Sequence, residues 1–149
     1  MKLLWVVNVI FPDFANKLGM ESNPSGSWMY SLLDALKKKE GLQISVVTVY
    51  QGKEKIYKNV DNIDYYLIPN FKSNWEDIFD SINPNLVHIH GAEYNYGLNL
   101  LSTRPNCKYI LSIQGIAFIK NISINIPYLI DIKKFSGNLV LNQMKRKKI

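Results

Sequence analysis

Two histidines separated by one residue are the side chains in this sequence best suited to chemistry. His88 and His90 flank Ile89 in an apolar run that ends at Gly91. Alternate side chains of a strand point to the same face, so both imidazoles should share one face, with His90 at the strand end. An imidazole can donate a hydrogen bond to a sugar hydroxyl or a phosphate, or act as a base. We therefore predict His90 as the catalytic candidate and His88 as a hydrogen-bonded core residue.

The histidine pair does not predict a metal site. A tetrahedral site needs further ligands, and no third histidine is present to complete one. We expect neither a bound metal nor a cofactor.

Polar residues after two apolar runs are candidates for sugar or acceptor binding. Glu93 lies three residues after His90 and is either an acceptor contact or a charge in the first turn of a helix. Gln114 follows the apolar run KYILSI and precedes Gly115. An amide beside a glycine at a strand end suits hydroxyl-rich ligands, and it is also common in turns. Together with Gly91, these residues form the predicted acceptor or sugar-binding set.

The connection inside FPDFANKLGMESNPSGSWMYSLLDALKKKEG, residues 11–41, is unusually long. An apolar strand ends just before it and an amphipathic helix begins within it, whereas such connections usually take about 2–6 residues. Free amides and the dipole at a helix start favour phosphate binding, and a glycine permits close approach. We therefore predict Ser25, Gly26 and Ser27 as a phosphate loop; the alternative is an ordinary serine cap. Neither G-x-G-x-x-G nor G-x-x-x-x-G-K-[ST] is present.

The elements that must position these residues alternate along the chain. Hydrophobic patterns predict strands at 3–10, 44–50, 64–68, 86–90 and 108–113, helices at 26–39, 73–82 and 94–102, and a loop or short hairpin at 53–62. This order favours an α/β fold with a Rossmann-like, open, mostly parallel sheet and helices on both faces. Ligands bind beyond the carboxyl ends of such strands, which is where the candidate residues lie.

Composition and charge narrow the class of protein. The chain has 149 residues, 47% of them apolar and 20% charged, which is typical of a globular domain. Four of the six net positive charges fall in residues 145–148, so the body is nearly neutral and does not indicate nucleic-acid binding. One cysteine excludes an internal disulfide and fits a cytoplasmic location. Residues 3–11 loosely mimic a signal peptide, but without a cleavage site they favour a buried strand.

An ordered set of segments resembles a known family. LWVVNVIFPDF, PSGSWMYSLLDALKKKEGLQISVVTVY, INPNLVHIHG and YILSIQGI together resemble the N-terminal domain of family-4 (group 1) glycosyltransferases, over about residues 1 to 120. The resemblance implies one half of a GT-B fold and a retaining transfer from a nucleotide-sugar donor, without an essential metal. Ser25-Gly26 stands where many relatives have two glycines that close over the donor phosphate. His90 matches a histidine that often ends the fourth strand, and Gln114 replaces a histidine of many relatives.

The resemblance also sets expectations for organisation and partners. Residues 1–138 should form the acceptor-side domain and 139–149 a basic tail or partial helix, while the second, donor-binding domain is absent and would come from the same gene or an adjacent chain. The chain alone should therefore not catalyse efficient transfer. The implied setting is bacterial surface polysaccharide synthesis, with a glycan or lipid-linked acceptor. The implied location is the cytoplasm, with peripheral contact at the inner membrane face.

Two other functions fit the same residues. The chain is alternatively a non-catalytic Rossmann-like or flavodoxin-like binding module, or the remnant of a truncated gene. A transferase half should bring Gly26, His90 and Gln114 to one open cleft beside an apolar flank, whereas a finished domain should cover that flank.

Overall fold

A computed structural model describes residues 1–21, 27–69, 75–91 and 100–112 of the chain. The chain divides into two compact units, 1–114 and 115–149, and every described residue belongs to the first unit. Within these described ranges, no helix is long and apolar enough to cross a membrane.

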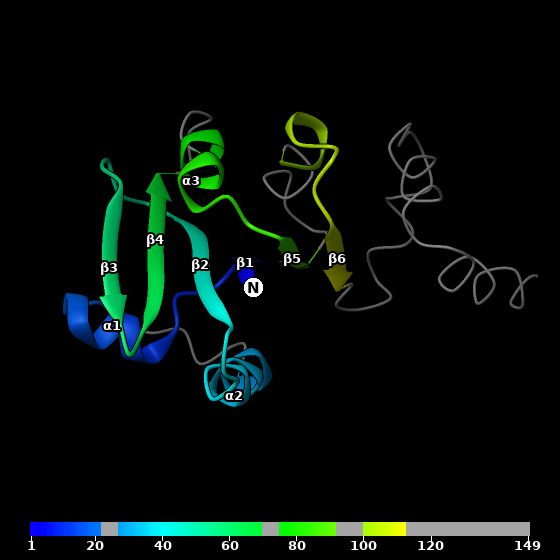
Figure 1. Cartoon of the computed structure of the whole chain (residues 1–149). Coiled ribbons are helices and arrows are strands. Elements are labelled where there is room, and N and C mark those ends of the chain that lie inside the picture. The colour runs from blue at the N-terminus through cyan, green and yellow to red at the C-terminus, as the bar shows by residue number, and fades with distance from the viewer. Residues whose placement is uncertain (22–26, 70–74, 92–99, 113–149) are drawn as a thin grey trace, which may run out of the picture. The chain divides into compact units, whose positions relative to one another are not determined.

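Six strands form one sheet in the order β3-β4-β2-β1-β5-β6 (Figure 1). The strands are β1 (Lys2–Val7), β2 (Gln43–Tyr50), β3 (Ile56–Val60), β4 (Ile63–Pro69), β5 (Leu86–His90) and β6 (Tyr109–Ser112). All neighbouring pairs are parallel except β3 with β4. The parallel strands run outward from β1 in both directions, which is the strand order of a Rossmann-like sheet. The predicted fold class is therefore confirmed.

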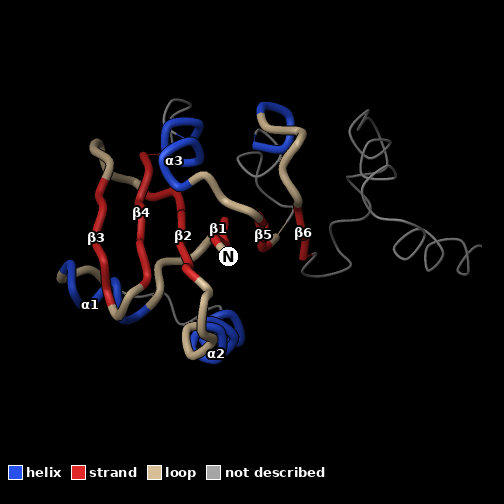
Figure 2. The backbone as a smooth tube through the Cα atoms, in the orientation of Figure 1, coloured by secondary structure: helices blue, strands red, loops and turns tan. Residues whose placement is uncertain are grey.

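Helices cover both faces of this sheet (Figure 2). The helices α1 (Pro12–Leu18) and α2 (Ser27–Leu36) supply Phe14, Met29 and Leu33 to one core, which also contains Trp5 of β1. The helix α3 (Trp75–Ile82) packs on the other face, where its core includes Leu4 of β1. Residues 100–103 are also helical, and Leu100 is buried in the same core as α3.

The central strand β1 shows why the first apolar run predicted a buried strand. Its residues from Leu3 to Val7 are all buried, because alternate side chains enter the two cores. A strand buried on both faces needs a continuous apolar sequence rather than an alternating one. The strand ends at Val7, three residues before the predicted end.

The prediction of one long loop after β1 is wrong at residues 12–18, which form α1. Pro12 lies in its first turn, and Gly19 closes it in a left-handed conformation with φ +65°. Proline at the start and glycine just after the end are typical helix boundaries. Phe14 and Ala15 bury the inner side of this short helix. The connection is therefore long partly because it contains a second helix.

The segment predicted as a loop or hairpin at 53–62 is a hairpin strand. The strand β3 runs antiparallel to β4, and the turn between them consists of Asp61 and Asn62, both with positive φ. Two such residues fit the tight turns that match the twist of paired strands. The hairpin adds an antiparallel edge to a sheet that is otherwise parallel.

Candidate functional site

The carboxyl ends of β1 and β5 form the centre of the candidate site. These strands are neighbours, and the strand order reverses at this point, where α/β sheets usually bind ligands. His90 is the last residue of β5, as predicted, and Gly91 follows it with φ +92°. The Gly91 N–H donates to the carbonyl of Ser112, which ties the ends of β5 and β6 together at 2.8 Å.

Several predicted site residues lie outside the part of the chain that the structure describes. Ser25, Gly26, Glu93, Gln114 and Gly115 belong to this group. Ser27 begins α2, and the structure describes its backbone alone. The predicted convergence of Gly26, His90 and Gln114 therefore stays a prediction.

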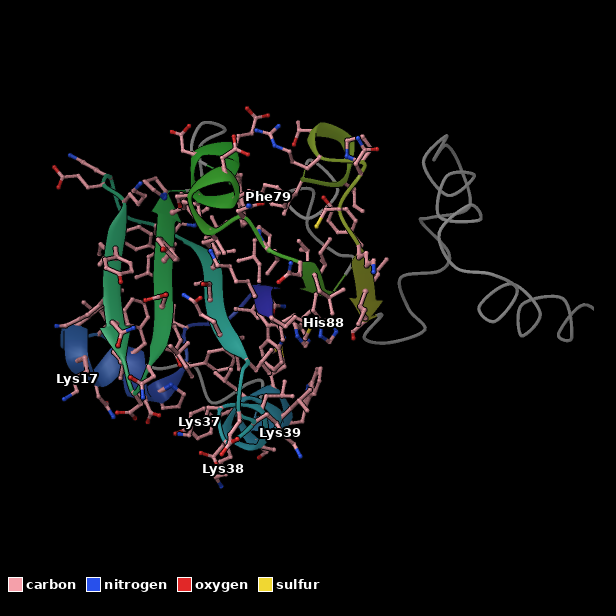
Figure 3. The ribbon with its side chains drawn as sticks, viewed as in Figure 1. Lys17, Lys37, Lys38, Lys39, Phe79 and His88 are labelled. Carbon is pink, nitrogen blue, oxygen red and sulfur yellow. The ribbon has the colours of Figure 1, made fainter. Side chains whose placement is uncertain are left out.

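The His90 ring lies in an aromatic cluster built from three elements. Its centroid is 4.4 Å from the Trp5 ring of β1, 5.5 Å from the Trp28 ring of α2 and 3.8 Å from the His88 ring. His90 is only 1% exposed, whereas Trp28 is 46% exposed. Figure 3 shows His88 beside β5, on the side of the sheet where α2 lies. The cluster thus joins a buried imidazole to an indole ring that solvent can reach.

The buried imidazole of His90 is electrically neutral at physiological pH. Burial, with a further contribution from His88, lowers the pKa of His90 to about 3. Among the described residues, neither Nδ1 nor Nε2 of His90 has a hydrogen-bond partner, although both atoms are buried. A neutral imidazole offers one donor and one acceptor, which suits a hydroxyl group better than a phosphate charge. The same low pKa makes His90 a weak base at pH 7.

His88 is hydrogen-bonded, as the sequence predicted. Its Nε2 lies 2.7 Å from Ser112 Oγ on the adjacent strand β6, and burial lowers its pKa. A serine paired with a histidine is also the beginning of a hydrolytic triad. Among the described residues, no carboxylate bonds to the second ring nitrogen of His88. The pair thus links β5 to β6 through their side chains.

Three further residues also have a buried polar side-chain atom with no hydrogen-bond partner among the described residues. They are Trp5 Nε1 in β1, Asn8 Oδ1 just after β1 and Thr48 Oγ1 near the end of β2. A buried polar group without a partner costs about 1–3 kcal/mol, so such groups need an explanation. In the part of the chain described, these three and the two His90 nitrogens are the buried side-chain atoms without partners. Asn8 and Thr48 lie toward the carboxyl edge of the sheet, whereas Trp5 lies in the middle of β1, where its ring contacts the His90 ring.

Sequence reasoning missed Trp5, Asn8, Thr48 and Trp28 as site residues. Asn8 carried a usable signal, because it is a lone polar residue at the end of an apolar run. Trp28 carried no such signal, because the helical pattern placed it among the core residues. Its exposure depends on how the neighbouring strands pack. In the described ranges, no three His, Cys, Asp or Glu side chains lie close enough together to hold a metal ion.

Two surface hollows lie at opposite edges of the sheet. One of about 530 Å³ opens between the carboxyl ends of β1 and β2, beside Asn8. The other, of about 410 Å³, lies at the amino ends of β5 and β6, where Arg104 pairs with Asp80 at 2.6 Å. Only the first occupies the edge at which parallel α/β sheets bind ligands.

The fold is a Rossmann-like α/β domain, and its candidate site lies at the carboxyl ends of β1 and β5, beside the aromatic cluster around His90. Comparison of the chain with protein-family models, curated proteins and solved structures returned no match.

Proposed function

We propose that this chain is the N-terminal, acceptor-side half of a retaining glycosyltransferase that uses a nucleotide-sugar donor. The setting is bacterial surface polysaccharide synthesis, and the acceptor is a glycan, free or lipid-linked, at the inner face of the cytoplasmic membrane. The observation that carries the proposal is the neutral, unpartnered His90 beside the exposed ring of Trp28. Aromatic walls with a few polar groups are typical of small-molecule sites.

We also propose that sugar transfer depends on a second domain. Transfer releases a nucleoside diphosphate, whose growing negative charge must be stabilised by preorganised positive groups. Among the described residues, the rings packed against His90 are those of Trp5, Trp28 and His88, and burial lowers the pKa of both histidines. These neutral rings can hold hydroxyl groups but supply no positive charge. We expect the cationic groups on a second Rossmann domain, from the same gene or an adjacent one.

A nucleotide-release assay tests the proposal. The chain is assayed with a panel of nucleotide sugars, first alone and then together with any Rossmann domain that the same gene or an adjacent gene encodes. We expect release from the pair only, and a loss of about 100-fold in the pair that carries His90→Phe, because one site donor is removed. The matched control is Asn106→Ala at the opposite edge of the sheet, which should keep full activity. Efficient transfer by the chain alone would contradict the dependence on a second domain.

A non-catalytic binding module is the second candidate. The low pKa of His90 favours it, because a neutral ring that is a weak base still binds hydroxyl groups. The same assay separates the two functions. If the reunited pair transfers no sugar from any donor, and the chain alone still binds a ligand at this edge, the binding module is the better description.

A further inference from the structure

The strand β3 forms an open edge of the sheet. Among the described strands it is the last one on its side, and Figure 1 shows it outermost. Its middle residues, Tyr57, Lys58 and Asn59, are exposed. An edge strand presents backbone N–H and C=O groups with which a further strand can pair. This edge is separate from the candidate site, because β4 and β2 lie between β3 and β1.

The two-residue turn between β3 and β4 determines which backbone groups of β3 face outward. Val60 and Ile63 flank this turn, and the flanking pair of a two-residue hairpin exchanges hydrogen bonds. Hydrogen-bonded and non-hydrogen-bonded pairs then alternate along the two strands. Asn59 belongs to the second pair from the turn and Tyr57 to the fourth, so neither residue bonds to β4 through its backbone. The N–H and C=O groups of both residues therefore point toward the open edge.

The side chains at this edge surround one carboxylate. Asp64 Oδ1 accepts hydrogen bonds from the Tyr57 hydroxyl at 2.9 Å and from Asn59 Nδ2 at 2.8 Å. Among the described residues, no group donates to the other oxygen, Asp64 Oδ2. The Tyr57 ring lies 5.0 Å from the Tyr66 ring, which packs against the core that contains α3. The carboxylate thus lies near two aromatic rings on the α3 side of the sheet.

This combination of groups favours a cationic side chain. The face of a tyrosine ring attracts an ammonium or guanidinium group, and the Asp64 carboxylate supplies the opposite charge. Tyr57 is 54% exposed, so a partner can reach its ring. The hydrogen bond to Asp64 already holds this ring in place, so little side-chain entropy is lost when a partner covers it. Tyrosine is also among the residues that contribute most to binding at protein interfaces.

Lys58 argues against a second copy of the chain at this edge. Its Nζ donates to the Lys17 carbonyl at the end of α1, at 2.9 Å, so its side chain lies on the opposite face of the sheet from Tyr57. In the antiparallel register that pairs all of β3 with its copy, each Lys58 would lie opposite its counterpart. Like charges directly opposite each other destabilise paired strands. The net charge of +6 also opposes self-association.

We propose that the edge of β3 binds an extended segment of a partner protein, which adds an antiparallel strand to the sheet and places an arginine or lysine side chain on Tyr57 and Asp64. The backbone of this segment pairs with the outward groups of Tyr57 and Asn59. Its cationic group contacts Asp64 Oδ2 and the Tyr57 ring, and the residue that faces Lys58 is neutral or acidic. This interaction does not depend on the sugar transfer proposed above.

Titration of the isotope-labelled 149-residue chain with a defined peptide tests the edge. The probe is the acetylated and amidated peptide Ser-Thr-Arg-Val-Arg-Thr-Ser, whose arginines share one face when it is extended. One control peptide has glutamate in place of both arginines. The other keeps both arginines but carries a methyl group on their backbone nitrogens, so it keeps the charges and cannot donate to the edge. We expect saturable shifts of the Tyr57, Lys58 and Asn59 amides with the probe alone.

Variants of the chain separate the carboxylate, the ring and the backbone. Asp64→Asn and Tyr57→Leu should each weaken binding about 2- to 5-fold, because each removes one attraction for the cation. Asn59→Pro removes an outward N–H and no bond to β4, and should weaken binding about 2- to 10-fold relative to Asn59→Ala. The matched control is Asp34→Asn on α2, which makes the same change on the opposite face and should bind normally.

Several results would overturn the proposal. It fails if the probe gives no saturable shifts at millimolar concentration, if the glutamate peptide binds equally well, or if methylation of the arginine nitrogens leaves binding unchanged. Equal affinities of Asp64→Asn and Asp34→Asn would reject the role of the carboxylate. If the β3 amides shift when the concentration of the chain alone is raised, a second copy occupies the edge instead. Should the melting temperature show that Asn59→Pro does not fold, the methylated peptide decides the role of the backbone.

Discussion

Acidification from pH 7 to pH 5 probes the environment of His90 directly. In the unfolded chain a histidine titrates near pH 6.5, whereas burial lowers the pKa of folded His90 to about 3. Between these two values the unfolded state binds more protons than the folded state. The free energy of unfolding must therefore fall as the pH falls through this range.

The expected size of this effect follows from the two pKa values of His90. Integrating the proton uptake from pH 7 to pH 5 gives a loss of about 2 kcal/mol from His90 alone. His88 adds to the loss in the same direction, because burial also lowers its pKa. Most carboxylates titrate below this pH window, so they contribute little to the change.

The variant His90→Phe isolates the contribution of this imidazole. Phenylalanine keeps an aromatic ring between Trp5 and Trp28 but cannot take up a proton. We expect the variant to lose about 2 kcal/mol of the pH dependence. At pH 7 its free energy of unfolding should lie within about 1 kcal/mol of that of the original chain, because neither nitrogen of His90 bonds to a described residue. The control Thr48→Val removes another unpartnered buried group that does not titrate, and should leave the pH dependence unchanged.

Urea unfolding at pH 7, 6 and 5, followed by far-ultraviolet circular dichroism, measures these differences. Equal pH dependence in the original chain and in His90→Phe would refute the reasoning, because it would mean that folded His90 accepts a proton near neutral pH. A loss of several kcal/mol in His90→Phe at pH 7 would mean that its ring nitrogens have partners in solution.

Three further predictions concern α1, and urea unfolding at pH 7 measures each of them. Phe14→Ala should cost about 3–5 kcal/mol, because Phe14 is fully buried and stacks on Tyr65 at 4.7 Å; a cost below about 1 kcal/mol would mean that α1 is not docked. Gly19→Ala should lower the free energy of unfolding by about 1–2 kcal/mol, because a φ of +65° strains any residue with a Cβ, although an added Cβ would meet no atom within 4 Å. An unchanged free energy of unfolding would argue against this helix end. Tyr30→Phe should cost about 1 kcal/mol through the lost bond to Asp13 at 2.6 Å. This bond raises the pKa of Tyr30, so its contribution should disappear as the pH rises above 10.

The strands could be predicted from the sequence because an apolar run indicates a segment whose side chains are buried against the helices of the sheet. Both ends of the strand at residues 86–90 were predicted correctly, because Pro84 precedes the apolar run and Gly91 ends it. The helix α1 was not predicted, because seven residues with two buried side chains leave too weak a period. Pro12 and Gly19 looked like loop residues, although they mark the start and the end of this helix.

The candidate site could be predicted only where a residue's position in a strand determines its place. His90 met that condition, because the end of a parallel strand lies at a known edge of the sheet. The exposure of Trp28 and the burial of Asn8 Oδ1 without a partner among the described residues depend on how α2, β1 and β2 come together. Such properties arise from packing between distant segments, and no local pattern encodes them.

The central position of β1 has a consequence for synthesis of the chain. Leu3 pairs with Ile44 of β2 on one side and with Leu86 of β5 on the other. At roughly 5–20 residues per second, the ribosome adds Leu86 about 4–17 s after Leu3. The apolar strand β1 is therefore synthesised before both of its neighbours, and its pairing with β5 is completed late. Until then, β1 can pair with segments other than its native neighbours. We expect stalled nascent chains that end before β5 to be sensitive to protease, and those that extend past β6 to be protected; equal protection would show that β1 is covered earlier.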